Sequence, residues 1–184
     1  MRIIAGRLKG RSLHVPRSAT FRPTTDRVKE SVFNILAGYV DWGDVSVCDL
    51  YAGSGGLGLE ALSRGAGQVT FVERSKASLV TLERNIETLG VSAQASIIRM
   101  PVEKFLRQRT IKFSLVFADP PYADAFLDEL NVHIAPVLQP GGVAVVEHAG
   151  DRTLEPTSHL EVIDRRDYGT TSVTFFRPTD GESA

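Results

Sequence analysis

The sequence predicts one α/β domain built around a mostly parallel β-sheet. The chain has 184 residues, about the length of a single domain that can bury a substantial core. Between residues 45 and 147, apolar runs of strand length alternate with segments of helical periodicity. A glycine-rich segment separates the first of these runs from the helical segment behind it. Alternation of this kind implies parallel strands joined by right-handed helical crossovers.

The expected elements follow from the period of the apolar residues. Continuous or alternating apolar runs predict strands at residues 45–50, 68–72, 95–99, 113–118, 142–147, 160–167 and 172–177. A period near 3.6 predicts helices at residues 58–64, 76–89, 103–109 and 125–137. Ser75 is expected to cap the second of these helices and Gly90 to end it. Only residues 169–171 separate the last two strands, so this pair is expected to form an antiparallel hairpin.

The residues before the first strand predict an arm and a helix. Two short strands, residues 2–5 and 12–15, are expected to be joined by a basic turn. A helix is expected to start at Thr24 or Thr25 and to end at Gly38. We therefore divide the chain into three parts: an N-terminal arm at residues 1–23, a main domain at 24–178 and a flexible tail at 179–184.

Charge is distributed unevenly along the chain. Its net charge is −1, yet residues 1–30 hold eight basic and two acidic side chains, which leaves the remainder at −7. A basic arm on an acidic body is typical of a surface that binds phosphates. A solvated charge run and an organelle transit peptide are the alternatives, but glycines and prolines in the arm oppose the amphipathic helix that a transit peptide needs. The candidate phosphate contacts are Arg2, Arg7, Lys9, Arg11 and Arg22.

The glycine-rich segment has the pattern of a cofactor-binding loop. Gly53, Gly55 and Gly58 match G-x-G-x-x-G between a predicted strand and a predicted helix. Glu73 follows Gly53 by 20 residues, at the end of the next strand, where an acid can accept both hydroxyls of a ribose. A surface charge facing neighbouring basic residues is the alternative for Glu73. The pattern alone fits a nicotinamide dinucleotide as well as any other adenosine cofactor.

Asp49 separates these two cofactor classes. Its carboxylate lies at the mouth of the glycine loop, where it would repel the pyrophosphate of a dinucleotide. It suits a cationic ligand without phosphate, such as S-adenosylmethionine, which carries a sulfonium and an ammonium group. The alternative is that Asp49 only braces the loop by accepting backbone N–H bonds.

Asp119-Pro120-Pro121-Tyr122 follows the predicted strand 113–118 and is suited to hold a flat ring that bears an amino group. Prolines have no N–H group, so the carbonyls beside them stay available as acceptors. The Asp119 carboxylate and the Pro120 carbonyl can then converge on one NH2 group, while Tyr122 offers a stacking face. The alternative is an ordinary strand-to-loop turn.

These candidates are expected to share one edge of the sheet. Asp49, Glu73, Pro101 with Val102, and Asp119 lie at or just past the ends of four successive predicted strands. Ligands of such sheets bind outside the carboxyl ends of the strands. The sequence therefore predicts one composite site that holds both a cofactor and an amino-bearing acceptor.

The chain resembles the RsmD family of class I S-adenosylmethionine-dependent methyltransferases over nearly its whole length. The resemblance rests on Arg2-Ile3-Ile4-Ala5-Gly6 with Gly10, on residues 22–30 with Phe33-Asn34, on residues 49–55 and 57–66, on Phe71-Val72-Glu73, on Asp119-Pro120-Pro121-Tyr122 and on Tyr168-Gly169. The segment that begins Arg22-Pro23-Thr24 and the N-terminal strand pair are more diagnostic of the family than the two loops. Two positions depart from the family pattern: Tyr122 stands where Phe is frequent, and Pro101 where Asp or Asn often lies near the adenine.

The resemblance implies a Rossmann-like sheet of seven strands in the order 3-2-1-4-5-7-6, with the last strand antiparallel. It implies methylation of a guanine 2-amino group in 16S rRNA, within a 30S subunit or an assembly intermediate. Catalysis is expected at Asp119, Pro120, Pro121 and Tyr122. Cofactor binding is expected at Asp49, Ala52, Gly53, Gly55, Glu73 and Val102. RNA binding is expected at the five basic residues of the arm.

Other features bound the function more weakly. A single cysteine, Cys48, allows no intramolecular disulfide, which agrees with a cytoplasmic protein. The four histidines show no metal-ligand spacing, and no apolar run is long enough to cross a membrane, so neither metal nor membrane is expected. A monomer is expected. Three rival functions remain: a dehydrogenase, a DNA adenine or cytosine amino-methyltransferase, and an RNA-binding module without catalytic activity.

Overall fold

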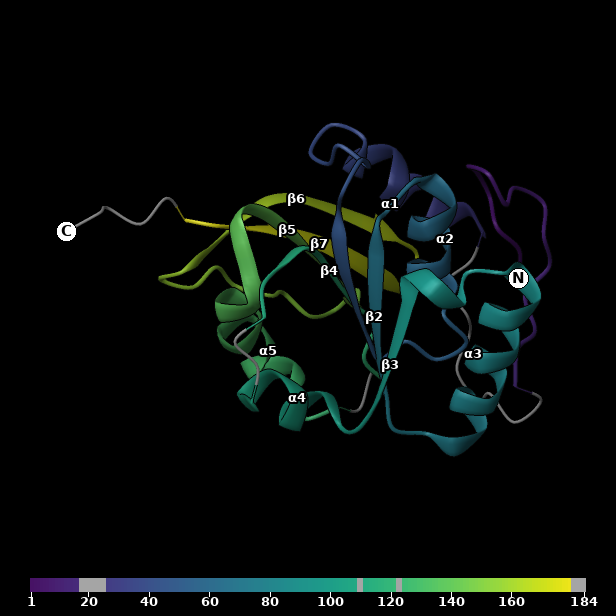
Figure 1. Cartoon of the computed structure of the whole chain (residues 1–184). Helices are drawn as coiled ribbons and strands as arrows, with labels where there is room; N and C mark the ends of the chain where they lie inside the picture. The colour runs from purple at the N-terminus through teal and green to yellow at the C-terminus, as the bar shows by residue number, and fades with distance from the viewer. Residues whose placement is uncertain (17–25, 109–110, 122–123, 180–184) are drawn as a thin grey trace.

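The computed structural model describes residues 1–16, 26–108, 111–121 and 124–179. Its centre is a seven-stranded sheet in the order β3-β2-β1-β4-β5-β7-β6, with helices on both faces (Figure 1). The strands are β1 (Ser46–Leu50), β2 (Gln68–Glu73), β3 (Ala95–Arg99), β4 (Phe113–Ala118), β5 (Leu138–Ala149), β6 (Leu160–Tyr168) and β7 (Thr171–Pro178). The helices are α1 (Asp26–Leu36), α2 (Gly56–Arg64), α3 (Lys76–Leu89), α4 (Val102–Gln108) and α5 (Leu127–Ile134), with 3-10 turns η1 (Ser92–Gln94) and η2 (Ala135–Val137). The expected strand order is confirmed.

The direction of each strand also agrees with the sequence prediction. β1 lies at the centre and pairs in parallel with β2 on one side and β4 on the other. β7 runs antiparallel to both β5 and β6. The β6–β7 turn contains Gly169 at a φ of 65°, a conformation that glycine adopts without strain.

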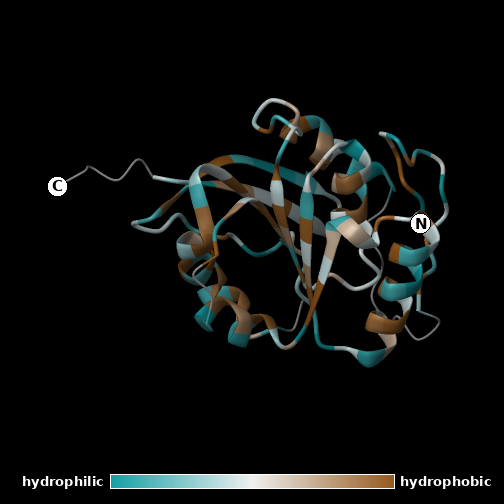
Figure 2. Cartoon of the chain, viewed as in Figure 1, coloured by the Kyte–Doolittle hydropathy of each residue, from teal (hydrophilic) through white to brown (hydrophobic). Residues whose placement is uncertain are grey.

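Each face of the sheet has its own apolar core. One core joins α1, α2 and α3 to the sheet, and within it Phe33 stacks on Trp42 and packs against Phe117. The other core joins α4 and α5 to the opposite face, with Phe105 against Phe113. Figure 2 shows the resulting pattern, with hydrophobic residues along the strands and polar ones on the outer turns of the helices. A sheet covered on both faces explains why its central strands read as nearly continuous apolar runs.

Two elements, β5 and α5, differ from their predicted bounds by three or more residues at one end. β5 begins at Leu138 rather than residue 142, because a register shift opposite Phe113 and Leu115 admits extra residues. A Cβ atom on Gly142 would lie 3.1 Å from the Ser114 carbonyl oxygen, so glycine permits this close approach. α5 ends three residues earlier than expected and continues as the 3-10 turn η2. Pro136 explains this difference because it lacks an N–H donor for a continued α-helix.

The N-terminal arm pairs with itself over a shorter stretch than expected. Arg2 and Ser12 form one antiparallel bridge, and the Ile3 N–H donates to the Arg11 carbonyl at 2.9 Å, but no regular strand forms. The turn at Gly6 presses on α2, where an added Cβ would lie 1.9 Å from the Ser63 carbonyl oxygen. The expected boundary at residues 23 and 24, the expected helix start at Thr24 or Thr25, and residues 180–184 of the expected tail lie outside the described residues.

A buried ion cluster anchors the arm to the domain. Glu60 on α2 is fully buried and pairs with Lys29 of α1 at 3.4 Å and with Arg64 at 2.9 Å. Its two carboxylate oxygens also accept the Ile4 and Ala5 N–H groups, at 2.7 and 3.0 Å. Burial lowers the pKa of Lys29, and the Glu60 charge opposes that shift. The cluster joins the arm, α1 and α2 through charge-assisted hydrogen bonds.

Candidate active site

Asp49 and Asp119 lie at the same edge of the sheet. Asp49 is the fourth residue of β1, and Asp119 directly follows the last residue of the adjacent strand β4. In the parallel pairing of these strands Leu50 lies opposite Ala118. The charges of Asp119 and Glu73 both raise the pKa of Asp49, which places each of these carboxylates within electrostatic reach of Asp49. The predicted convergence at the carboxyl edge is present.

Asp49 is almost completely buried, with 2% of its surface exposed. Desolvation is the largest cause of its raised pKa, which lies at about 8, whereas the bond from the Gly58 N–H lowers that pKa. This N–H donates to Asp49 Oδ2 at 2.8 Å. Asp49 therefore braces the first turn of α2, which was the alternative explanation of this residue. A carboxylate has about four lone-pair sites, so the same group can still face a cation.

The glycine loop between β1 and α2 uses left-handed backbone at three positions. Tyr51, Gly53 and Gly55 have φ angles of 58°, 56° and 86°. A Cβ on Gly58 would lie 2.4 Å from the Phe71 ring, so this glycine serves the packing of α2 on β2. A Cβ on Gly53 would meet nothing closer than 3.9 Å, so the loop leaves space beside Gly53 where a ligand can approach.

Glu73 holds the glycine loop against the end of β2. Its Oε2 accepts the Gly53 N–H at 2.8 Å, and its Oε1 accepts the Arg74 and Ser75 N–H groups, each at 2.7 Å. Glu73 is 9% exposed, so it is not the solvated surface charge that was the alternative. The Gly53–Glu73 bond gives a structural reason for the 20-residue spacing: the first glycine and the acid meet across two adjacent strand ends.

Val102 and Ala52 lie at the carboxyl edge, Val102 in the core of one face of the sheet and Ala52 in the core of the other. Val102 is the first residue of α4 and is buried, while the preceding Pro101 is exposed. The first N–H groups of a helix have no partner inside it, so the Val102 N–H can serve as a donor to a ligand. The Ala52 N–H donates to the Val72 carbonyl at 3.1 Å, which commits this donor to the fold and leaves the residue a packing role.

The acceptor segment turns sharply after β4. Pro120 is buried and Pro121 half-buried, and the Pro121 carbonyl accepts the Asp124 N–H at 2.8 Å. The Pro120 carbonyl precedes a residue without an N–H group, as the sequence predicted. Asp119 is half-buried at the edge that Asp49 and Glu73 share. Tyr122, the expected stacking residue, lies outside the described residues.

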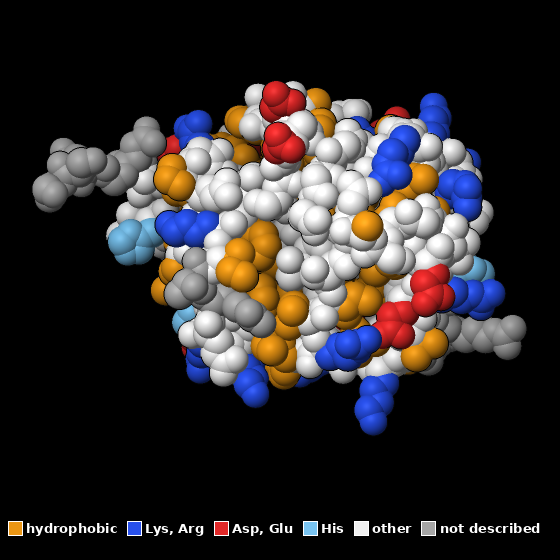
Figure 3. All heavy atoms as spheres, in the orientation of Figure 1, with side chains coloured by type: hydrophobic (Ala, Val, Ile, Leu, Met, Phe, Trp, Pro, Cys, Tyr) orange, Lys and Arg blue, Asp and Glu red, His pale blue; other side chains and the backbone are white. Residues whose placement is uncertain are grey.

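The tip of the basic arm does not lie at this edge, whereas Met1 and His14 lie near the glycine loop. A Cβ on Gly56 would lie 2.8 Å from Met1 Sδ, and Asn85 bonds both His14 and Ser54. Arg7 donates to the Gln94 side chain at 2.6 Å, just before β3 begins, and Arg11 donates to the Thr88 carbonyl at 3.0 Å near the end of α3. Arg2 pairs with Asp26 at 3.2 Å. The tip of the arm thus lies near the amino edge, and in the face shown in Figure 3 the basic side chains are spread around the periphery. Lys9 is exposed, and Arg22 lies outside the described residues.

Sequence reasoning missed two features, one at this edge and one in the ion cluster that anchors the arm. The first is Tyr51, which has a left-handed backbone and a buried hydroxyl group beside the charges of Asp124 and Glu103. Burial and these negative charges raise the pKa of Tyr51. The second is the pairing of Lys29 with Glu60. Its signal was present, because Lys29 interrupts the apolar stripe of a predicted helix and Glu60 lies between Leu59 and Ala61.

These residues fit S-adenosylmethionine by their donor and acceptor chemistry. The space beside Gly53 leaves room for a ligand to approach the backbone. The Asp49 carboxylate suits a cation and the Glu73 carboxylate suits a ribose. The Val102 N–H group suits a ring acceptor. Within the described ranges, no cluster of three or more His, Cys, Asp or Glu side chains is arranged to hold a metal ion. The helices described there are also too short or too polar to cross a membrane.

Comparison with known proteins agrees with this geometry. A family described as conserved hypothetical protein 95 matches residues 1–177. The ribosomal RNA small subunit methyltransferase D of Haemophilus influenzae is 37% identical over 187 residues, covering 96% of this chain and 93% of that protein. Its Escherichia coli namesake is 43% identical over 129 residues, which cover 70% and 64% of the two chains.

A solved structure extends the likeness to three dimensions. The Escherichia coli protein yhhF superposes with a TM-score of 0.85 at 33% identity, covering 97% of both chains. The matched length and the strand order agree with each other. This chain belongs to the conserved hypothetical protein 95 family, which is the RsmD family of class I methyltransferases.

Proposed function

We propose that this protein transfers a methyl group from S-adenosylmethionine to the exocyclic 2-amino group of a guanine in 16S rRNA. One observation carries the proposal: Asp49 and Asp119 lie at the carboxyl ends of adjacent parallel strands, and the charge of Asp119 raises the pKa of Asp49. A group suited to a cationic donor thus lies beside a group suited to an amino acceptor. The names of the relatives, small-subunit ribosomal RNA methyltransferases, support rRNA as the substrate.

The proposed roles on the cofactor side follow from the contacts in the site. Asp49 faces the cationic end of the cofactor, Glu73 accepts its ribose hydroxyls, and the Val102 N–H donates to its adenine ring. Gly53 and Gly55 shape the loop, and Ala52 supports it through β2. When bound, the cofactor supplies an electrophilic methyl group on its sulfonium. Every other step rests on side chains and carbonyls of the protein itself.

On the acceptor side, Asp119 and Pro120 change the electronic state of the amino group. The lone pair of the guanine 2-amino nitrogen is delocalised into the ring. Two hydrogen bonds, to the Asp119 carboxylate and the Pro120 carbonyl, favour a pyramidal nitrogen whose lone pair points out of the ring plane. The nitrogen would then attack the methyl group that a bound cofactor supplies, with the N–C bond forming as the S–C bond breaks, and its extra proton would leave to water. Pro121 holds the turn rigid, and Tyr122 stacks on the base.

The substrate must expose its base before this chemistry can occur. A guanine inside a helix would have to be unstacked, at a cost of a few kcal/mol, unless it is already single-stranded. We propose that a 30S subunit or an assembly intermediate presents it in that state and that the protein acts as a cytoplasmic monomer. The RNA phosphates are contacted by Arg2, Arg7, Lys9, Arg11 and Arg22.

The test is methyl transfer with labelled S-adenosylmethionine to 30S subunits, to naked 16S rRNA and to duplex DNA. The subunits and rRNA come from a strain that lacks this gene, so that the target position is unmodified. Mapping of the label to the 2-amino group of one guanine in 16S rRNA is the expected result. Label on duplex DNA alone, or on no nucleic acid while S-adenosylhomocysteine still binds, would refute the proposed substrate.

A further inference from the structure

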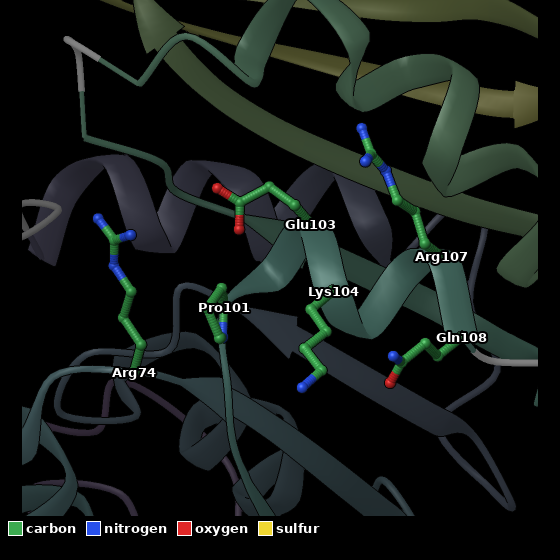
Figure 4. Close-up of a pocket in the computed structure, with 6 residues that line it drawn as sticks. All are labelled: Arg74, Pro101, Glu103, Lys104, Arg107 and Gln108. Atoms are coloured by element: carbon green, nitrogen blue, oxygen red, sulfur yellow. The ribbon is translucent and has the colours of Figure 1, made fainter.

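A basic hollow lies beside the proposed active site, outside the residues assigned above to catalysis or to the arm. It has a volume of about 430 Å³ and is lined by Arg74, Pro101, Glu103, Lys104, Arg107 and Gln108. Figure 4 shows Arg74 on the loop after β2, facing the side chains of α4 across the hollow. Three of the six lining side chains are cationic and one is anionic, so the hollow has a net positive charge.

The position of this hollow matters because the neighbouring site is acidic. Asp49, Glu73 and Asp119 gather at the carboxyl edge, and Asp124 lies close to Tyr51 in the same region. An RNA strand brings a negative charge with every nucleotide, so these carboxylates repel the strand that must deliver its base to them. Cations on the flank of the site offset this repulsion. Arg74 and Pro101 directly adjoin the cofactor candidates Glu73 and Val102, which sets the hollow at that flank.

The cations of the hollow can turn to an external anion. Arg74 and Lys104 are exposed, and neither forms an ion pair in the described part of the chain. Arg107 pairs with Glu129 at 3.5 Å, with both side chains more than half exposed. An exposed pair of this kind contributes little and exchanges easily for a phosphate, which can accept two parallel bonds from a guanidinium group.

We propose that the hollow binds backbone phosphates of the RNA strand that flanks the methylated nucleotide. This inference rests on the proposed function and adds a second RNA contact surface to it. The tip of the arm binds RNA near the amino edge, whereas the hollow holds the strand at the carboxyl edge, beside the reacting base. The hollow thereby sets the approach of the substrate without touching the reacting atoms.

The test compares Lys104→Ala/Arg107→Ala and Lys104→Glu with wild type. Binding of 30S subunits is measured by filter retention between 50 and 200 mM KCl, and KM and kcat are measured with the same subunits. Losing two phosphate contacts is expected to weaken binding by roughly tenfold at low salt and to reduce the log–log salt slope by about 1.5. The loss should appear in KM, and affinity for S-adenosylhomocysteine should match wild type.

Lys112→Ala is the matched control, because Lys112 is an exposed lysine just before β4, at the opposite edge of the sheet. It should bind subunits as wild type does. An unchanged KM and salt slope in both hollow variants would overturn the inference, as would a loss confined to S-adenosylhomocysteine affinity, which would assign the hollow to the cofactor. Filter retention needs no methyl transfer, so hollow-dependent binding by a protein that methylates nothing would refute only the proposed function.

Discussion

Asp49 lies near the carboxyl end of β1 and Asp119 directly after the adjacent parallel strand β4, and the charge of Asp119 helps to raise the pKa of Asp49. Keeping two acidic groups ionised close to each other costs free energy in the protein without ligand. A ligand with a positive charge between them would relieve that cost, so the arrangement favours a cationic donor over an anionic one.

Asp49 has two separable roles: the proposed attraction of its charge for a cationic ligand, and the bracing of α2 by its oxygen, which accepts the Gly58 N–H. Asp49→Asn removes the charge but keeps an oxygen that can accept the Gly58 N–H, whereas Asp49→Ala removes both. We expect Asp49→Asn to weaken S-adenosylmethionine binding by at least tenfold without loss of thermal stability. Asp49→Ala should lower both the affinity for the cofactor and the thermal stability. Calorimetric titration and thermal unfolding measure the two effects. Wild-type affinity in Asp49→Asn would leave Asp49 with the bracing role alone.

Cofactor affinity is expected to rise with pH. The pKa of Asp49 lies at about 8 in the free protein, so this carboxyl is mostly protonated at pH 6. A bound cation favours the ionised form, so binding releases a proton and the affinity increases by up to about tenfold per pH unit. Titration between about pH 6 and 7 keeps the α-ammonium group of the cofactor mostly protonated, because the pKa of an α-amino group lies at about 7.7–8.0. Asp49→Asn should show a flat profile, and a flat wild-type profile would contradict the assignment.

The same pKa predicts how stability depends on pH. Because burial raises the pKa of Asp49 above its ordinary value of 3.8, the folded protein binds more protons than the unfolded chain between about pH 4 and 8. Its contribution to the free energy of unfolding is therefore full below pH 4 and falls as pH rises to 8, by at most about 1.4 kcal/mol per unit. Urea unfolding at pH 5 and 8 should show a smaller decline for Asp49→Asn than for wild type.

Asp119 is expected to act on the rate of methyl transfer rather than on cofactor binding. A charge-assisted bond contributes about 1.5–3 kcal/mol, so Asp119→Ala should lower kcat on the order of 100-fold. Affinity for S-adenosylhomocysteine should stay within a few-fold of wild type, because the role proposed for Asp119 is toward the acceptor. Single-turnover rates with 30S subunits make the comparison. A kcat close to wild type would remove Asp119 from the mechanism.

The buried ion cluster predicts a compensating pair of substitutions. Glu60→Gln leaves Lys29 buried without its carboxylate, which should lower the free energy of unfolding by about 3–5 kcal/mol. Lys29→Met removes the stranded cation, so the double variant should recover much of this loss. Urea unfolding of both single variants and of the double variant measures the coupling. Additive losses would show that Lys29 and Glu60 do not depend on each other.

Gly6 and Gly10 form a matched pair in the arm. Both have positive φ angles, of 80° and 82°, so alanine strains the backbone by about 1–2 kcal/mol at either position. Only Gly6 touches α2; a Cβ on Gly10 would meet nothing within 4 Å. Gly6→Ala should therefore lower the Tm clearly more than Gly10→Ala. Equal shifts in thermal unfolding would mean that the arm does not dock on α2 as described.

The sequence by itself determined the alternation of strands and helices, the antiparallel final pair and the residues at four successive strand ends. It did so because apolar period and turn composition are local properties, and because parallel strands end at a common edge. The β5 register shift was not predictable, since it depends on the approach of Gly142 to the Ser114 carbonyl on the adjacent strand.

Tertiary structure alone decided how the site and its surroundings are held together. Asp49 and Glu73 bind backbone N–H groups 9 and 20 residues away, and the burial that raises the pKa of Asp49 exists only once both faces of the sheet are covered. The position of the arm tip at the amino edge and the basic hollow beside α4 depend likewise on packing between distant segments. Desolvation and proximity are properties of the folded chain, so no local pattern could specify them.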